Sequence, residues 1–180
     1  MKILGISGSP RKGNSEWMLR RLLEMLSRAG HSADLVLLRE MSIKQCRGCL
    51  ACESGGAGRS GKCKIHDDVK DILPRMLEAD IIVMGTPVYF DMLSGRLKNF
   101  MDRTCAIWPK LAGKKMAGIA VAEEDIGKAI DNLKTYAGIC SMDWIGQATA
   151  LAKLPRAVAH DPAAEEQVAR LANEICSTRP

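Results

Sequence analysis

The chain has 180 residues, of which 47% are apolar and 26% are charged, and its formal net charge is +5 at pH 7. This length is enough to bury a core without disulfides, so a single domain spanning 1–180 is expected. No apolar run is long enough to cross a bilayer, and the first residues do not resemble an export signal. We therefore expect a cytoplasmic protein with no membrane partner, whose cysteines stay reduced. The basic residues are not interleaved with aromatic ones, which argues against nucleic-acid binding.

Short apolar runs alternate with amphipathic stretches along the whole chain. The periodicity predicts strands at 2–7, 33–38, 80–85 and 115–122, and a less regular strand near 144–150. It predicts helices at about 14–29, 67–79, 93–104, 126–137 and 162–176. Five strand–helix units in series indicate an α/β fold with a doubly wound, five-stranded parallel sheet. A cysteine-rich loop is inserted at about 41–66. Ligands of such sheets bind beyond the carboxyl ends of the strands.

The turn after the first predicted strand has the composition of an anion-binding loop. Its sequence, S-G-S-P-R-K-G-N-S, supplies glycines, hydroxyls, an arginine and main-chain amides at a helix N-terminus, all of which favour a phosphate group. It matches neither the Walker motif nor G-x-G-x-x-G. Helix capping alone would explain Asn14 and Ser15, but a hydroxyl-rich turn that also contains Arg11 favours phosphate binding. The candidate phosphate ligands are Ser7, Ser9, Arg11, Asn14 and Ser15.

Four cysteines lie close together in the inserted loop, in the pattern C-x2-C-x2-C-x10-C. A zinc site uses one C-x2-C pair as one arm, so the middle cysteine of an overlapping run would be redundant. Three cysteines at three-residue steps with a more distant fourth are typical of a [4Fe–4S] site. We predict Cys46, Cys49, Cys52 and Cys63 as the metal ligands. The basic residues of the same segment, Lys44, Arg47, Arg59, Lys62 and Lys64, would offset the negative charge of such a cluster.

The segment that follows the third predicted strand is unusually bulky. Pro87 stiffens it, and Val88, Tyr89 and Phe90 place large side chains at the carboxyl end of a strand. Two adjacent aromatic residues there favour a flat ligand. A hydrophobic plug or a contact between subunits would explain them equally well.

Three motifs in this order form a recognisable set: G-S-P-R-x-G-N-S, C-x-G-C-x-x-C with a later C-x3-D-D, and G-T-P-V-Y-F-x-x-L-S-G-x-L-K-N-F-x-D-R. Over about residues 2–122 the chain resembles the flavodoxin-like NADPH-dependent FMN reductase superfamily, and within it the iron–sulfur flavoprotein branch. The resemblance implies FMN, with its phosphate on the first loop and its isoalloxazine along Pro87, Val88, Tyr89 and Phe90. It also implies a homodimer or homotetramer in which flavin sites approach neighbouring subunits.

The chain departs from this pattern in two places. Ten residues separate Cys52 from Cys63, where relatives usually have fewer. The segment 120–127, with Glu123 and Glu124, replaces the glycine-rich loop that relatives often carry after the fourth strand. Outside the motifs, we expect Cys105 to continue the apolar stripe of its helix into the core. Cys140 and Cys176 have no cysteine or histidine at ligand spacing.

These features predict an FMN-dependent oxidoreductase of the electron-transfer type. FMN carries the chemistry, and no side chain is expected to act as a general acid or base. A [4Fe–4S] cluster would relay electrons between FMN and a small-molecule or ferredoxin-type donor, with NAD(P)H as a possible donor. One alternative is an NAD(P)H-dependent FMN or quinone reductase without a cluster. Another is a non-catalytic module in which the cysteine loop binds zinc.

Overall fold

The computed structural model describes residues 1–53 and 62–178. The glycine-rich part of the cysteine loop, including Arg59, lies outside the described residues. The strands are β1 (Lys2–Ser7), β2 (Ser32–Leu37), β3 (Ile81–Tyr89), β4 (Met92–Leu93), β5 (Lys115–Ala122) and β6 (Asp143–Leu151). Five of them form a parallel sheet in the order β2-β1-β3-β5-β6, and β4 pairs antiparallel with β3. The predicted doubly wound α/β fold is therefore confirmed, in the strand order of flavodoxin-like proteins.

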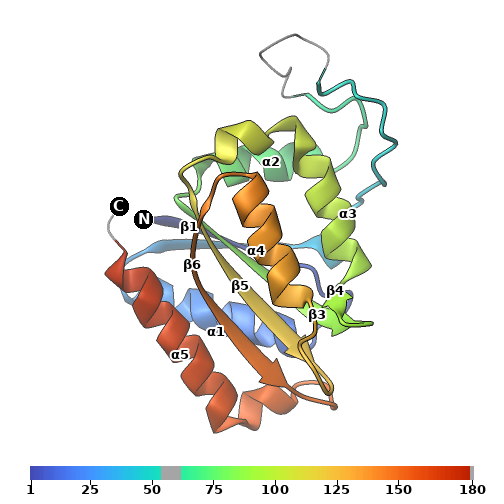
Figure 1. The fold of residues 1–180 in the computed structure, drawn as a ribbon. Coiled ribbons are helices and arrows are strands. Elements are labelled where there is room, and N and C mark those ends of the chain that lie inside the picture. Colours follow the sequence, from blue (N-terminus) through green and yellow to red (C-terminus); the bar gives the residue numbers. More distant parts are fainter. Residues whose placement is uncertain (54–61, 179–180) are drawn as a thin grey trace.

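Two layers of helices cover the sheet (Figure 1). The helices α1 (Asn14–Arg28) and α5 (Pro162–Ser177) pack on one face, and α2 (Val69–Glu78), α3 (Gly95–Arg103) and α4 (Ala129–Ile139) pack on the other. Short 3-10 helices connect them: η1 (Leu38–Glu40), η2 (Thr104–Ala106), η3 (Trp108–Leu111) and η4 (Ala157–His160). No helix of the described residues is long and apolar enough to cross a membrane.

The strands are apolar on both sides because helices cover both sides of the sheet. In β3, Ile82 and Met84 face the layer of α2, α3 and α4, whereas Ile81 and Val83 face α1 and α5. This alternation buries both faces and explains the nearly unbroken apolar run in the sequence. A Cβ on Gly5 would lie 2.7 Å from a methyl carbon of Leu23, so the glycine lets α1 approach β1 closely.

The third strand is longer than expected. We predicted its end at residue 85, but the parallel pairing with β5 continues to Pro87, opposite Val121. Beyond that point Val88 and Tyr89 pair with Leu93 and Met92 of β4. The partner strand, which local periodicity does not reveal, keeps this segment extended. The residues expected in a loop therefore stand largely on the rigid end of a strand.

Helix boundaries also differ by a few residues from the expectation. We expected α3 to begin at 93, but Ser94 caps it, its hydroxyl accepting a hydrogen bond from the amide of Leu97 at 3.2 Å. Helix α2 remains one helix from Val69 to Glu78 although it contains Pro74.

Candidate functional site

The ends of β1 and β3 form one edge where the strand order reverses, because β2 and β3 lie on opposite sides of β1. The amide of Gly8 donates to the carbonyl of Gly85 at 2.7 Å. The hydroxyl of Ser94 donates to the carbonyl of Gly8 at 2.8 Å, while the amide of Ser94 donates to Thr86 Oγ1 at 2.9 Å. These bonds join the first loop, the end of β3 and the start of α3. Sheets of this strand order bind their ligands at such a reversal point.

The predicted anion loop is folded back on itself at this edge. Ser7, Ser9 and Ser15 are buried, whereas Arg11 is exposed. The hydroxyl of Ser9 donates to the carbonyl of Arg11 at 2.6 Å and accepts from the Arg11 amide at 3.3 Å. The structure thus brings the predicted hydroxyls and the arginine together in one tight turn.

The N-terminus of α1 follows this turn directly. Its N-cap residue is Gly13, and the described residues give it no side-chain cap. The first amides of a helix have no partner inside the helix, so the uncapped end of α1 offers them to an anion. Asn14 donates from Nδ2 to the carbonyl of Leu154 at 2.9 Å, and its buried Oδ1 has no hydrogen-bond partner among the described residues. These residues fit a phosphate-bearing cofactor such as FMN.

The predicted aromatic segment forms a rigid projection beside the same edge. Tyr89 is 43% exposed and Phe90 is fully exposed at 102%. Phe90 and Asp91 both have left-handed backbone angles, with φ of 50° and 60°. Gly127 supports this turn, because a Cβ at that position would lie 2.5 Å from Cβ of Asp91. Two exposed aromatic side chains on a turn of constrained backbone are suited to contact a flat ligand or another subunit.

The acidic residues that follow β5 are paired with a lysine. Glu123 and Glu124 each lie 3.7 Å from the ammonium of Lys153. All three side chains are exposed, so these pairs contribute little stability, but they offset part of the negative charge beside the edge formed by β1 and β3.

Helix α3 extends in space from this edge to the cysteine loop, which precedes it in the sequence. Three side chains on one face of α3, at positions i, i+3 and i+7, donate to main-chain carbonyls of the passing segment: Arg96 to Leu38 (2.9 Å), Asn99 to Ile43 (3.1 Å) and Arg103 to Lys44 (2.6 Å). Seven residues of α-helix span about 10 Å. The segment therefore runs along α3 from its N-terminus to its C-terminus, away from the carboxyl ends of the strands.

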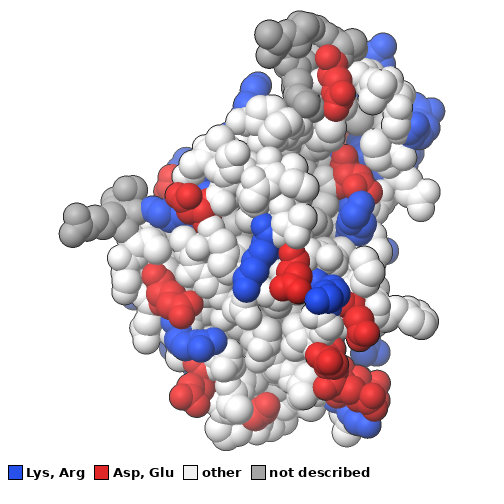
Figure 2. Space-filling model, viewed as in Figure 1, with Lys and Arg blue, Asp and Glu red and all other residues white. Residues whose placement is uncertain are grey.

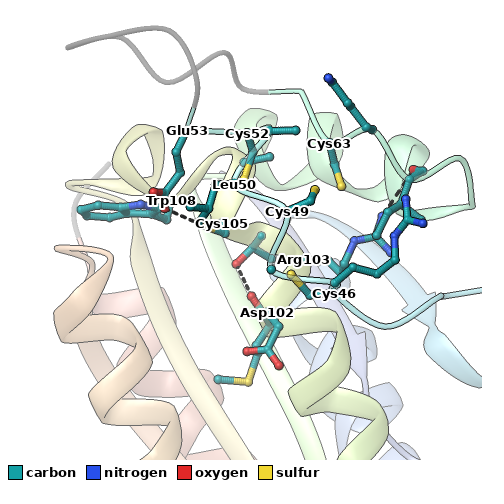
Figure 3. A pocket seen from close by; sticks show the side chains of 18 of the residues that line it. Cys46, Cys49, Leu50, Cys52, Glu53, Cys63, Asp102, Arg103, Cys105 and Trp108 are labelled. Atoms are coloured by element: carbon teal, nitrogen blue, oxygen red, sulfur yellow. Dashed lines mark hydrogen bonds between the residues drawn. The ribbon is translucent and has the colours of Figure 1, made fainter.

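The predicted cysteines line a cavity of about 710 Å³ at that far end. Cys46 and Cys49 are exposed, while Cys52 and Cys63 are partly buried. Figure 3 shows these thiols around the cavity, together with Cys105, Trp108 and Arg103. Among residues 1–53 and 62–178, no three His, Cys, Asp or Glu side chains are gathered closely enough to hold a metal ion. Iron–sulfur clusters are bound by thiolates, and the four predicted thiols line this cavity, so the type of donor fits such a cluster.

A buried ion pair closes the base of the cysteine loop. Arg103 Nη1 lies 2.6 Å from Asp67 Oδ2, and the side chains are 1% and 0% exposed. The Lys44 amide also donates to Asp67, at 2.8 Å. Burial by itself would raise the pKa of Asp67, but hydrogen bonds from Arg103 and from the Lys44 amide hold the pKa below its ordinary value. Burial likewise disfavours the charged form of Arg103, but Asp67 and the neighbouring Cys63 thiol raise its pKa overall.

The expectation for Cys105 is wrong. We expected it in the core, but it is partly exposed and lines the cysteine cavity, where its thiol donates to Glu53 Oε1 at 3.5 Å. The reason is that α3 ends at Arg103 and the chain continues as η2, which changes the direction of the side chain. Burial, the Cys52 thiol and Glu53 raise the pKa of Cys105 to about 11. Cys140 is buried beside the cavity, and the thiol of Cys176 lies 3.6 Å from Nε2 of His31.

The sequence and the fold both match proteins of known families. The family model described as NADPH-dependent FMN reductase matches residues 1–153. The chain belongs to this family. It is 41% identical over 104 residues to an iron–sulfur flavoprotein of Archaeoglobus fulgidus, covering 58% of this chain and 49% of that protein. It is 42% identical over 105 residues to one of Methanocaldococcus jannaschii, covering 58% and 52%.

This FMN reductase family member also has the fold of solved flavodoxins. It superimposes on the flavodoxin of Streptococcus pneumonia TIGR4 with a TM-score of 0.65 and 16% identity, covering 98% of this chain and 99% of that one. The chain spans about half the length of the curated relatives reported above.

Sequence reasoning missed several residues around the cysteine cavity of this family member. Asp67 belongs to the C-x3-D-D motif and to the start of a predicted helix, and Arg103 belongs to the third motif, but neither was predicted as part of a site. The spacing of Arg96, Asn99 and Arg103 on one helix face was a usable signal for a polar contact surface. Cys105 had no such signal, because its position depends on where α3 ends.

Proposed function

We propose that this protein is an FMN-dependent oxidoreductase that binds FMN at the edge formed by β1 and β3. The observation that carries the proposal is the uncapped N-terminus of α1 at the reversal point of the sheet. The phosphate would be held by Ser7, Ser9, Arg11, Asn14 and Ser15, and the ring would lie along Pro87, Val88, Tyr89 and Phe90. FMN supplies one- and two-electron chemistry when bound, and the protein contributes binding and orientation.

We further propose that Cys46, Cys49, Cys52 and Cys63 hold a [4Fe–4S] cluster. The shared cavity and the basic segment around it support this assignment. The lysine and arginine side chains at positions 44, 47, 62 and 64 are exposed. Both relatives compared above are named iron–sulfur flavoproteins. Thiolates carry negative charge, so the basic side chains would stabilise a cluster and would also attract an acidic electron carrier such as a ferredoxin.

The neighbours of the two candidate fourth thiols favour Cys63 over Cys105. A cluster ligand is a thiolate, and a negative charge is stabilised beside a cation and destabilised beside a carboxylate. Cys63 adjoins the guanidinium of Arg103, whereas Cys105 adjoins the carboxylate of Glu53. The longer spacing to Cys63 is therefore compatible with its role as the fourth ligand.

The two sites lie at opposite ends of α3, which favours an oligomer as the working form. The β3–β4 turn stands at the lower right of Figure 1, and the described residues of the cysteine loop stand at its upper right. Contact between the cavity of one subunit and the flavin edge of another would shorten the distance between the sites. We therefore propose a homodimer or homotetramer, located in the cytoplasm, with NAD(P)H or a ferredoxin-type carrier as the electron donor.

Anaerobic purification tests this proposal, with flavin, iron and acid-labile sulfide measured per chain and a visible spectrum recorded. We expect a brown protein that contains FMN, iron and sulfide. The variant Cys49→Ala should lose iron and sulfide while retaining FMN, because the flavin edge lies at the other end of α3. A yellow protein without iron would instead identify a cluster-free reductase. A colourless protein that contains zinc would rule out both redox functions.

A further inference from the structure

We propose that Arg103 is a positioning residue of the cysteine site, which fixes both stems of the cysteine loop and directs a positively charged donor group toward the cluster ligands. This inference rests on the proposed cluster. It goes beyond it, because Arg103 lies on α3 and outside the cysteine motif.

The contacts of Arg103 reach both stems of the loop. Nη1 donates to the carbonyl of Lys44 at 2.6 Å, on the stem that precedes Cys46. Nη2 lies 3.5 Å from the carbonyl of Ile65, on the stem that follows Cys63. Asp67 completes the arrangement, because it accepts from both Arg103 nitrogens, at 2.6 and 3.0 Å, and from the Lys44 amide at 2.8 Å. One guanidinium therefore fixes the distance between the two ends of the loop.

The remaining donor of the guanidinium, Nε, is not used by the carbonyls or by Asp67. Arg103 Nε is buried, and the Cys63 thiol, which lines the same cavity, lies within reach of the guanidinium. This donor is therefore left for the Cys63 thiol, which we propose as a cluster ligand. The charge of Arg103 also adjoins Cys63, as the effect of that thiol on the Arg103 pKa shows. Hydrogen bonds to cluster sulfurs and nearby charge set the reduction potential of a cluster.

A purely structural ion pair is the competing explanation, and the chain contains a matched control for it. Arg96 lies on the same face of α3 and makes the same kind of bond, from Nη1 to the carbonyl of Leu38 at 2.9 Å. It does not line the cysteine cavity. The variants Arg96→Lys and Arg103→Lys each retain a positive charge and each remove one planar guanidinium, but only the second removes a donor beside the cysteine cavity.

The experiment compares wild type, Arg96→Lys and Arg103→Lys after anaerobic purification. Iron, sulfide and FMN are measured per chain, and the midpoint potential of the cluster is determined by a titration followed by electron paramagnetic resonance. We expect Arg96→Lys to match wild type. We expect Arg103→Lys to retain FMN and to show a lower cluster potential, because a donor to the sulfurs is lost and the reduced state is less stabilised.

A double variant, Arg103→Gln with Asp67→Asn, keeps the site testable if Arg103→Lys does not fold. It removes both buried charges together, so neither charge is left without its partner. We expect it to lose at least half of its iron while keeping its FMN. A cluster potential in Arg103→Lys equal to that of Arg96→Lys, or a full iron content at unchanged potential in the double variant, would overturn the inference. Wild-type protein without iron would refute the cluster proposal itself, and the role of Arg103 would be rejected with it.

Discussion

Individual thiols in the cysteine cavity differ mainly in the charge that surrounds them. Cys63 adjoins a guanidinium that is itself fixed by Asp67, and Cys105 adjoins the carboxylate of Glu53. The cysteine pattern of the sequence selects Cys63, but it carries no information on the charges around either thiol. Their neighbours, which come from α3 and from the cysteine loop, make the difference.

Replacement of the two thiols tests this difference directly. We expect Cys63→Ala to lose at least half of the iron and sulfide per chain, and Cys105→Ala to retain the wild-type amounts. Metal and sulfide analysis of anaerobically purified protein measures both. The opposite result, with iron lost only in Cys105→Ala, would identify Cys105 as the fourth cluster ligand.

The buried pair of Asp67 and Arg103 should make stability depend on acid pH. The pKa of Asp67 is lowered in the folded protein, so its contribution is fully present above its ordinary value of 3.8 and is lost as the pH falls through the folded value. Asp67→Asn should lower the free energy of unfolding at pH 7 by about 3 to 5 kcal/mol, because Arg103 loses its charged partner. Urea unfolding of both proteins from pH 7 to pH 3 measures this effect.

The difference in stability between wild type and Asp67→Asn should then shrink as the pH falls below 4, because protonation removes the same charge in the wild type. A difference that stays constant down to pH 3 would show that the cost comes from lost packing and not from the charge of Asp67.

At the scale of elements, the proposed flavin edge depends on how closely the first loop approaches β3 and α3. Gly8 donates to Gly85 and accepts from Ser94, and a Cβ at Gly8 would lie 2.5 Å from Cβ of Leu97. The loop has no room for a side chain there. The geometry of the first loop and the start of α3 are therefore coupled.

Gly8→Ala should consequently displace the loop, lower stability and reduce bound FMN. We expect a loss of about 1 to 3 kcal/mol, typical of overpacking in a well-packed region, and a measurable fall in FMN per chain. Gly95→Ala is the matched control, because a Cβ there has no neighbour within 4 Å. In α3 it should be neutral or stabilise by up to about 1 kcal/mol. Thermal unfolding and extracted flavin measure both variants, and equal behaviour of the two would contradict the close approach.

At the scale of the whole molecule, charged side chains are interspersed, whereas several large exposed apolar side chains lie near the two candidate sites. Acidic and basic side chains are interspersed over the face shown in Figure 2, without one large patch of either sign. Large exposed apolar side chains stand at both ends: Leu50 and Ile139 near the cysteine cavity, and Phe90, Met92 and Leu154 near the proposed flavin edge. Exposed apolar side chains near both candidate sites fit an oligomer that joins them.

Phe90→Asp tests whether the aromatic projection is a contact between subunits. A charge at this fully exposed position should not disturb folding but should weaken an apolar interface, so we expect a smaller assembly than wild type. Sedimentation or light scattering at matched concentration measures the mass. An unchanged mass with a large loss of FMN would show that Phe90 contacts the flavin instead.

The sequence by itself determined the order of strands and helices, the two-sided burial of the sheet and the motifs of both sites. These follow from local periodicity and from residue types that suit phosphates or metals. Only the tertiary structure decided the extension of β3 by β4, the place of Cys105 in the cysteine cavity, and the pairing of Asp67 with Arg103. Each of these depends on contacts between segments far apart in the chain. The separation of the two proposed sites has the same origin, because the hydrogen bonds along α3 hold the cysteine loop at the end opposite the edge formed by β1 and β3.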